Sequence, residues 1–195
     1  MRLLTALFVC ALVATACTSD PSAYDTDEVE AMRSEKDEQF KESNDSPLPE
    51  DRKSSFAGLS YFPPDADYAV TATFTESASP DTVLMQTSTV QVRKAVRAGV
   101  FSFTLNNKKL RLTAYTFIDF DSDDSYFVPF TDKTTGNETY YAGRYLDVPV
   151  TGDSEYELDF NMAYNPYCAY SDRFSCPRVP QENDLAVEIR AGEKK

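Results

Sequence analysis

Short runs in which apolar and polar residues alternate constrain the fold of this chain more than any other feature. Tyr68–Phe74 alternates cleanly after Pro63-Pro64, and a period of two residues is typical of a strand with one buried face. Asn106-Asn107 separates two such runs. Because asparagine tolerates left-handed backbone geometry, we expect a tight hairpin there. Further strands are expected at 83–92, 96–105, 110–117, 126–130, 139–146, 156–160 and 185–190.

Together these runs give about eight or nine short strands joined by short turns, a pattern that favours an antiparallel β-barrel or sandwich. The preceding segment, 28–57, carries helix signals instead: Asp27 is placed to cap a helix, with Glu30 completing a capping-box pair. A second short helix is expected at 49–56. We therefore predict a mainly β protein, with one β domain at 58–195 preceded by one or two short N-terminal helices.

The first residues look like an export signal. Leu3–Ala14 is apolar but too short to span a bilayer, and small residues lead directly to Cys17. This pattern predicts a lipoprotein signal peptide at 1–16, lipid on the thiol of Cys17 and a polar tether at 17–27; ordinary signal cleavage nearby is the alternative. We expect a protein anchored to a membrane of the cell envelope. In a Gram-negative host, Thr18 favours the outer membrane, facing the periplasm.

Charge and histidine content exclude several classes of function. The net charge is −13, of which residues 20–51 contribute −9. Nucleic acid is therefore not an expected partner, because binding phosphates needs clustered Lys and Arg. The chain has no histidine, which removes Ser-His-Asp and Cys-His catalysis and the commonest metal ligands. Acid–base chemistry would fall to carboxylate, Tyr, Cys or Lys side chains. No cofactor is predicted.

The densest run of chemistry is Leu158–Tyr170, which is closed by Cys176-Pro177. It holds an acid, two side-chain amides, three tyrosines and a thiol within thirteen residues. The run begins at a strand end and continues into a loop that Pro166 restrains. Any small-molecule site in this chain is expected here.

This run and several flanking motifs resemble the DUF1684 family of bacterial and archaeal proteins over roughly residues 28–193. The flanking motifs are Glu30-Ala31-Met32-Arg33, Gly58-Leu59-Ser60-Tyr61-Phe62, Gly143-Arg144-Tyr145-Leu146, Pro180-Gln181-Glu182-Asn183 and Ile189-Arg190-Ala191-Gly192-Glu193. The family is named for its lack of a known function. The resemblance therefore implies a fold region and candidate residues but no reaction.

Cys168 and Cys176 are the cysteines left once the leader is removed and Cys17 is lipidated. An even pair in an exported protein predicts a disulfide. Two alternatives stay open, a redox-active thiol pair and a metal-binding pair. The spacing weakens the first because it differs from Cys-x-x-Cys. The absence of histidine weakens the second.

Nine side chains are candidates for ligand binding. Asp159 is a possible base or ligand anchor and Tyr164 a possible donor in a polar pocket at the barrel mouth; the alternative is that these polar side chains satisfy the backbone of an irregular loop. The full set is Tyr140, Arg144, Asp159, Asn161, Tyr164, Asn165, Glu182, Asn183 and Arg190.

Arg144 lies on a strand that is expected to be interior, where an arginine needs a carboxylate. Asp159 or Glu182 would supply it in a structural ion pair; otherwise Arg144 would bind an anionic ligand. Asp132 is expected mainly to bond the backbone of the turn at 132–139, and the alternative is that this turn borders the site, which its resemblance to the family's Phe-x-Asp-x-Thr-x-Gly pattern implies. The acidic segment 119–124 either gathers a calcium ion or is a solvated loop, and the solvated loop is preferred because EF-hand features are missing.

The sequence thus predicts a lipid-anchored binding module for a small or anionic ligand. Two other classes stay open. One is an enzyme that uses a carboxylate and tyrosine, or the cysteine pair, on the same surface. The other is a structural envelope protein without a small-molecule site.

Overall fold

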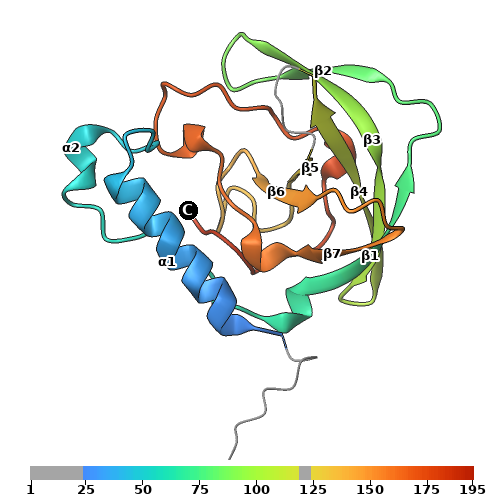
Figure 1. Ribbon diagram of the computed structural model, residues 1–195, viewed down its shortest axis with the longest axis horizontal. Helices are drawn as coiled ribbons and strands as arrows, with labels where there is room; N and C mark the ends of the chain where they lie inside the picture. Colours follow the sequence, from blue (N-terminus) through green and yellow to red (C-terminus); the bar gives the residue numbers. More distant parts are fainter. Residues whose placement is uncertain (1–23, 119–123) are drawn as a thin grey trace, which may run out of the picture.

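The computed structural model describes residues 24–118 and 124–195. The expected signal peptide, the lipidation site at Cys17 and most of the acidic segment 119–124 lie outside these residues. A curled antiparallel sheet forms a half-barrel, and two helices lie to one side of it (Figure 1). Within the described residues, the helices are too short or too polar to cross a bilayer.

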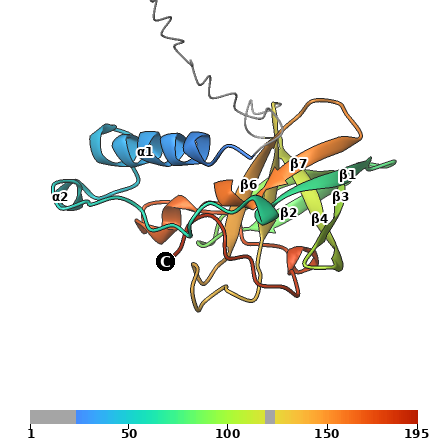
Figure 2. The ribbon, with the colours of Figure 1, turned by 90° about the horizontal axis from the view of Figure 1, so that it is seen from below.

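Helix α1 (Thr26–Glu42) is capped by Asp25 rather than by the expected Asp27. The Asp25 carboxylate accepts the N–H groups of Asp27 and Glu28 at 3.0 and 3.1 Å, which satisfies two donors that a helix start leaves free. Val29 and Phe40 are buried, whereas most of the helix is exposed. The helix therefore lies on the surface of the domain, beside the C-terminus (Figures 1 and 2). A single further turn, α2 (Glu50–Lys53), follows.

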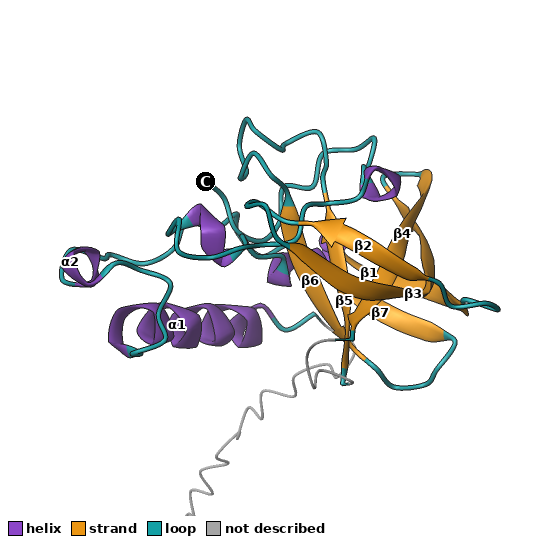
Figure 3. Ribbon diagram, turned by 90° about the horizontal axis from the view of Figure 1, so that it is seen from above, coloured by secondary structure: helices purple, strands orange, loops and turns teal. Residues whose placement is uncertain are grey.

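The sheet has seven antiparallel strands in the order β6-β5-β4-β3-β1-β7, with β2 paired to β3 (Figure 3). Their bounds are β1 (Ala69–Glu76), β2 (Thr82–Gln86), β3 (Val92–Leu105), β4 (Lys108–Phe117), β5 (Ser125–Phe130), β6 (Arg144–Pro149) and β7 (Glu155–Asp159). The predicted hairpin is confirmed, because Asn106 and Asn107 have φ values of 50° and 59° between β3 and β4. The mainly β fold class is confirmed as well.

Three of the expected strand boundaries are wrong. Residues 83–92 do not form one strand, because β2 ends at Gln86 and β3 begins at Val92. The strand expected at 139–146 begins only at Arg144, after a turn. The segment 185–190 has no ladder partner in the described part of the chain.

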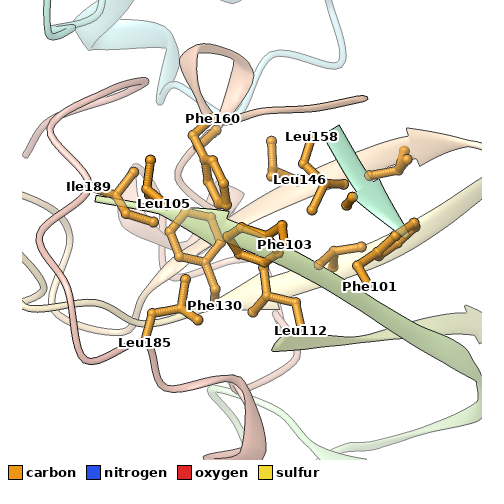
Figure 4. Packing of buried hydrophobic residues seen from close by; sticks show 14 of the residues in the cluster. Phe101, Phe103, Leu105, Leu112, Phe130, Leu146, Leu158, Phe160, Leu185 and Ile189 are labelled. Carbon is orange, nitrogen blue, oxygen red and sulfur yellow. The ribbon is translucent and has the colours of Figure 1, made fainter. Parts of the chain in front are cut away.

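The alternation in 185–190 has a different cause. Leu185, Val187 and Ile189 are all buried in the main core, which lies inside the curl of the sheet (Figure 4). Two backbone hydrogen bonds of 2.8 Å tie the segment to 131–133. The tail therefore fills the open side of the half-barrel with apolar side chains, which produces a period of two without a strand pair.

Strands β4, β5 and β6 have apolar residues on both faces. Leu112, Val128 and Leu146 face the main core, whereas Tyr115 and Phe127 belong to a second cluster on the opposite face. Because each face must be covered, the chain after β7 folds back across the second one. Two backbone hydrogen bonds between Tyr145 of β6 and Tyr164, 2.9 and 3.0 Å long, tie this returning segment to the sheet.

Candidate functional site

Arg144 is fully buried, and it binds the chain itself. Its guanidinium lies 2.9 Å from the carboxylate of Asp132, with side-chain exposures of 1% and 0%. It also donates to the backbone carbonyls of Ile189 (2.8 Å), Ala191 and Glu193 (3.3 Å). The expectation that Asp159 or Glu182 pairs with Arg144 is therefore wrong. Asp132 was not expected to pair with Arg144, because an aspartate in a turn commonly bonds the backbone of that turn.

Glu193, at the end of the same tail, is also fully buried. Its carboxylate accepts the ammonium of Lys36 at 2.6 Å, the backbone N–H of Asn165 at 2.8 Å and the hydroxyl of Tyr170 at 2.6 Å. It thereby joins α1, the loop after β7 and the C-terminus. We call Asp132, Arg144 and Glu193, with the groups they bind, the C-terminal latch.

Asp159 and Asn161 hold a second junction. The Asn161 amide accepts the N–H of Asp65 at 2.9 Å and donates to the Asp65 carbonyl at 2.8 Å. Asp159 accepts the N–H and the side-chain amide of Asn161, at 2.9 and 2.8 Å, and the hydroxyl of Tyr24 at 2.8 Å. Both side chains are thus bonded to the chain that precedes β1.

The remaining candidates also have partners within the protein. Asn183 is fully buried and bonds the backbones of Thr113 and Pro129 at 2.7–2.9 Å. Glu182 accepts the hydroxyl of Tyr115 at 2.8 Å and a guanidinium N–H of Arg97 at 3.1 Å. Arg190 is half exposed and pairs with Glu138 and Glu188.

These nine residues therefore do not converge on one pocket. Asn165 and Arg144 meet through Glu193, Asp159 and Asn161 lie at a separate junction, and Arg190 lies on the surface. Tyr164 alone of the nine lines the cavity described next. Ligand binding by the other eight stays a prediction, and the contacts described above are those of residues that join segments of the fold.

A cleft of about 580 Å³ lies on the second apolar face of the sheet. Seven aromatic rings line it, and we call it the aromatic cleft: Tyr115, Phe117, Phe127, Tyr145, Tyr164, Tyr167 and Phe174. Three strands supply the first four rings and the loop after β7 supplies the others. The volume lies in the range of small-molecule sites, which are mostly apolar with a few placed polar groups.

The rings hold one another in fixed orientations. Phe127 packs edge-on against Tyr145 with ring centroids 4.7 Å apart, and Tyr145 packs edge-on against Tyr164 at 5.8 Å. Tyr167 contacts Phe174 in the same manner at 5.2 Å. Edge-to-face contacts of this kind stabilise a particular arrangement of rings, so the walls of the cleft are preformed.

Two cations and one acid also line the aromatic cleft: Lys36, Arg93 and Asp147. The Lys36 ammonium lies 4.7 Å from the centroid of the Tyr164 ring. The Tyr164 hydroxyl donates to Asp147 at 2.7 Å. Burial, followed by the nearby carboxylate of Asp147, raises the pKa of Tyr164. The phenol therefore remains a donor at neutral pH.

The loop that forms one wall of the aromatic cleft carries both cysteines. No disulfide joins them in the structure; the N–H of Cys168 lies 3.1 Å from the sulfur of Cys176. The Tyr140 hydroxyl lies 3.5 Å from the carbonyl of Cys168. The disulfide expected from the sequence is not demonstrated, and it stays a prediction.

A larger groove of about 1260 Å³ runs between the start of α1 and strands β6 and β7. Eight carboxylates line it and none of its described lining residues is a lysine or arginine: the acids are Asp25, Asp27, Glu28, Asp147, Asp153, Glu155, Glu157 and Asp159. Within the described chain, acidic and cysteine side chains do not form a group of three that would hold a metal ion. We favour the smaller aromatic cleft as the candidate site because its lining is mostly apolar with a few polar groups, as in most small-molecule sites.

Sequence reasoning missed most of the aromatic cleft. Its rings lie on separate strands, and their spacing along the chain carries no motif. One signal was available: Tyr126–Phe130 is apolar at nearly every position, which indicates a strand covered on both faces rather than one. That pattern predicts a second apolar layer, which is where the cleft lies.

Comparisons with known proteins place the chain in a family without assigning it a function. The model of the family described as "Protein of unknown function (DUF1684)" matches residues 54–194. The solution NMR structure of an uncharacterized protein from Haloarcula marismortui is similar, with 41% sequence identity and a TM-score of 0.69; the match covers 87% of this chain and 93% of that one. A comparison with curated proteins gave no match. The chain therefore belongs to the DUF1684 family.

Proposed function

We propose that this protein is a lipid-anchored protein of the cell envelope whose domain binds a small ligand in the aromatic cleft. The ligand has an aromatic or apolar body and an anionic group. The single observation that carries the proposal is the convergence of seven aromatic rings and two cations on one cleft of about 580 Å³.

The aromatic body follows from the lining of the cleft. Burying a ring against apolar walls gives roughly 25 cal/mol for each Å² removed from water. Edge-to-face contacts with the preformed rings add about 0.5–1.5 kcal/mol for each pair. A ligand without an apolar body would gain neither term.

The anionic group follows from Lys36 and Arg93. Both line the same cleft, where they outnumber the one acid, Asp147, among its described lining residues. The Lys36 side chain is 28% exposed although it pairs with Glu193. An ammonium has three N–H donors, so it can bind Glu193 and a ligand together. Asp147, which accepts the hydroxyl of Tyr164, would repel an anionic ligand, so the anionic group is expected beside the two cations.

The membrane anchor is supported by the sequence before the described residues. Tyr24, the first described residue, lies seven positions after Cys17 in the sequence. At about 3.5 Å per residue this tether reaches no more than about 25 Å. The anchor would therefore hold the N-terminal end of α1 close to the bilayer surface.

Calorimetric titration with three naphthalene derivatives of matched shape tests the ligand class. We expect 2-naphthoate to bind the purified full-length protein with one site, and at least about tenfold more tightly than neutral 2-naphthamide, a difference of about 1.4 kcal/mol. Cationic 2-naphthylmethylammonium should bind weakest. The reverse order would contradict the anionic assignment.

A cleft-filling variant locates the site. Ser125 lies on the same face of β5 as Phe127 and lines the aromatic cleft, so Ser125→Trp places an indole in it. Ser102→Trp is the matched control, because Ser102 is exposed on β3 away from the cleft. Binding of 2-naphthoate should vanish in the first variant and persist in the second. Equal binding in both would place the site outside the aromatic cleft, and a wild type that binds none of the probes would favour a structural envelope protein without a small-molecule site.

Incorporation of a labelled fatty acid tests the anchor separately. The full-length chain should become labelled in a host that processes bacterial lipoproteins, and Cys17→Ser should not. Label that persists in Cys17→Ser would place the lipid elsewhere, whereas an unlabelled wild-type chain would favour ordinary signal cleavage.

A further inference from the structure

The cysteine pair beside the aromatic cleft is asymmetric. Cys168 lies in a short turn after Pro166 and is half-buried, whereas Cys176 is only 8% exposed. The backbone N–H of Cys168 lies 3.1 Å from the sulfur of Cys176, and the N–H of Cys176 lies 3.1 Å from the hydroxyl of Ser88. The thiol of Cys168 is thus the more accessible of the two, and that of Cys176 is buried.

A cavity of about 330 Å³ opens onto the pair, and it adjoins the aromatic cleft, with which it shares Tyr145 and Cys176 among its lining residues. Both cysteines line it together with Ser88, Tyr140 and Arg178. The cavity is large enough for a small molecule, and it brings such a molecule to the accessible sulfur. Ligand binding in the aromatic cleft does not require this cavity. We therefore consider what the cavity could bind.

The two thiols also differ in acidity. The hydrogen bond to Cys176 is the largest cause that lowers the pKa of Cys168 to about 6; burial opposes it, and weaker contacts with Ser88 and Tyr140 act in the same direction as the hydrogen bond. The same contact between the sulfurs raises the pKa of Cys176. Cys168 is therefore the more acidic thiol of the pair. A thiolate is the attacking species in thiol–disulfide exchange.

We propose that Cys168 and Cys176 form a thiol–disulfide exchange site for small aliphatic disulfides, with Cys168 as the attacking thiol and Cys176 as the resolving thiol. The Cys168 thiolate attacks one sulfur of the substrate, a mixed disulfide forms, and the first substrate thiolate leaves. The Cys176 sulfur then attacks Cys168, its proton passes to the departing second thiolate, and an intramolecular disulfide remains. The substrate gains the two electrons that the cysteine pair loses.

This proposal goes beyond the disulfide expected in an exported protein, because it assigns different roles to the two sulfurs and a substrate class to the pair. It does not require ligand binding in the aromatic cleft, although Cys176 also lines that cleft. Loss of 2-naphthoate binding in Ser125→Trp and the redox chemistry of the pair are measured by different readouts, so one proposal can fail without the other.

The first test is site-resolved alkylation of the reduced full-length protein, in which peptide mass spectrometry separates the two cysteines from Cys10 and Cys17. At pH 6 we expect Cys168 to react with iodoacetamide at least about tenfold faster than Cys176, because its larger thiolate fraction outweighs its lower intrinsic nucleophilicity. Equal rates, or a faster Cys176, would overturn the assignment of roles.

The second test traps the intermediate with glutathione disulfide. Cys176→Ser should accumulate a mixed disulfide on Cys168, whereas Cys168→Ser should leave Cys176 unmodified over the same time. The wild-type protein should instead form the intramolecular disulfide and release two equivalents of glutathione. An adduct on Cys176, or a wild-type pair that stays reduced, would refute exchange at this site.

Discussion

The C-terminal latch and the aromatic cleft lie on neighbouring parts of the domain but differ in how completely their chemistry is used. In the latch, the guanidinium of Arg144 binds Asp132 and three backbone carbonyls, and the carboxylate of Glu193 accepts three donors. In the cleft, seven rings enclose about 580 Å³. The charged groups of the latch are bonded to other groups of the same chain, whereas the cleft has space for a ligand.

The comparison shows that the charged residues that stand out in the sequence need not be the residues that bind a ligand. Charged residues in a motif attract attention, but a buried charge is tolerated only when it is paired. Arg144 and Glu193 therefore fix the C-terminal tail in place. Aromatic rings carry no such signature in the sequence, yet they provide the apolar walls that small-molecule sites use. The predictions below test this division, from the largest expected effect to the smallest.

Removing the carboxylate of the latch should have the largest effect. Asp132→Ala leaves Arg144 buried without its anion, and we expect a loss of about 3–5 kcal/mol in the free energy of unfolding. Urea denaturation of the purified protein measures it. An unchanged midpoint would mean that the latch does not stabilise the domain and would reopen an anion-binding role for Arg144.

Neutralising the other end of the latch should cost less. Glu193→Gln keeps the shape of the side chain but replaces one carboxylate oxygen, which accepts hydrogen bonds, by an NH2 group. That NH2 group would face the hydrogen-bond donors that now bind Glu193. We expect a loss of about 1–3 kcal/mol, together with faster proteolysis of α1 because its Lys36 contact weakens. Denaturation and limited trypsin digestion report these two effects. A stability equal to wild type would show that the tail is held by packing alone.

The cysteine pair beside the cleft should make stability depend on pH under reducing conditions. Because folding lowers the pKa of Cys168 from 9.0 to about 6, its stabilising contribution is complete above pH 9 and is lost as the pH falls to 6. The stability of wild type relative to Cys168→Ser should therefore rise between pH 6 and pH 9. We expect about 1 kcal/mol, since partial exposure reduces the full effect. Parallel pH profiles for the two proteins would contradict the lowered pKa.

The exposed ion pair of Arg190 is the matched control for the latch. Arg190→Gln removes a contact to Glu138 between side chains that are 48% and 32% exposed. We expect a loss far smaller than that of Asp132→Ala, because exposed ion pairs contribute little to stability. A loss as large as that of Asp132→Ala would break the distinction between buried and exposed pairs.

The parts of the fold that follow from local rules were predictable. The hairpin at Asn106-Asn107 needs two residues that tolerate positive φ, and the chain supplies them. The alternation of Tyr68–Phe74 correctly indicates β1. Two short N-terminal helices were also expected, although Asp25 rather than Asp27 caps the first.

The parts that depend on long-range pairing were not predictable in the same way. Alternation at 185–190 indicates a buried face but does not say whether the backbone pairs with a strand or lies across a core. The partner of Arg144 comes from a turn twelve residues earlier, where Asp132 also bonds the local backbone. The aromatic cleft depends on which faces of β4, β5 and β6 coincide, and that follows from strand register.

Native mass spectrometry of the protein purified from its own host tests the central claim most directly. It compares the wild type with Ser125→Trp, which fills the aromatic cleft, and with Asp159→Asn, which alters the most prominent acid of the sequence motif. We predict a non-covalent mass on the wild type and on Asp159→Asn that is absent from Ser125→Trp. A bare wild-type protein, or a mass that persists in Ser125→Trp and disappears from Asp159→Asn, would contradict the assignment of binding to the cleft.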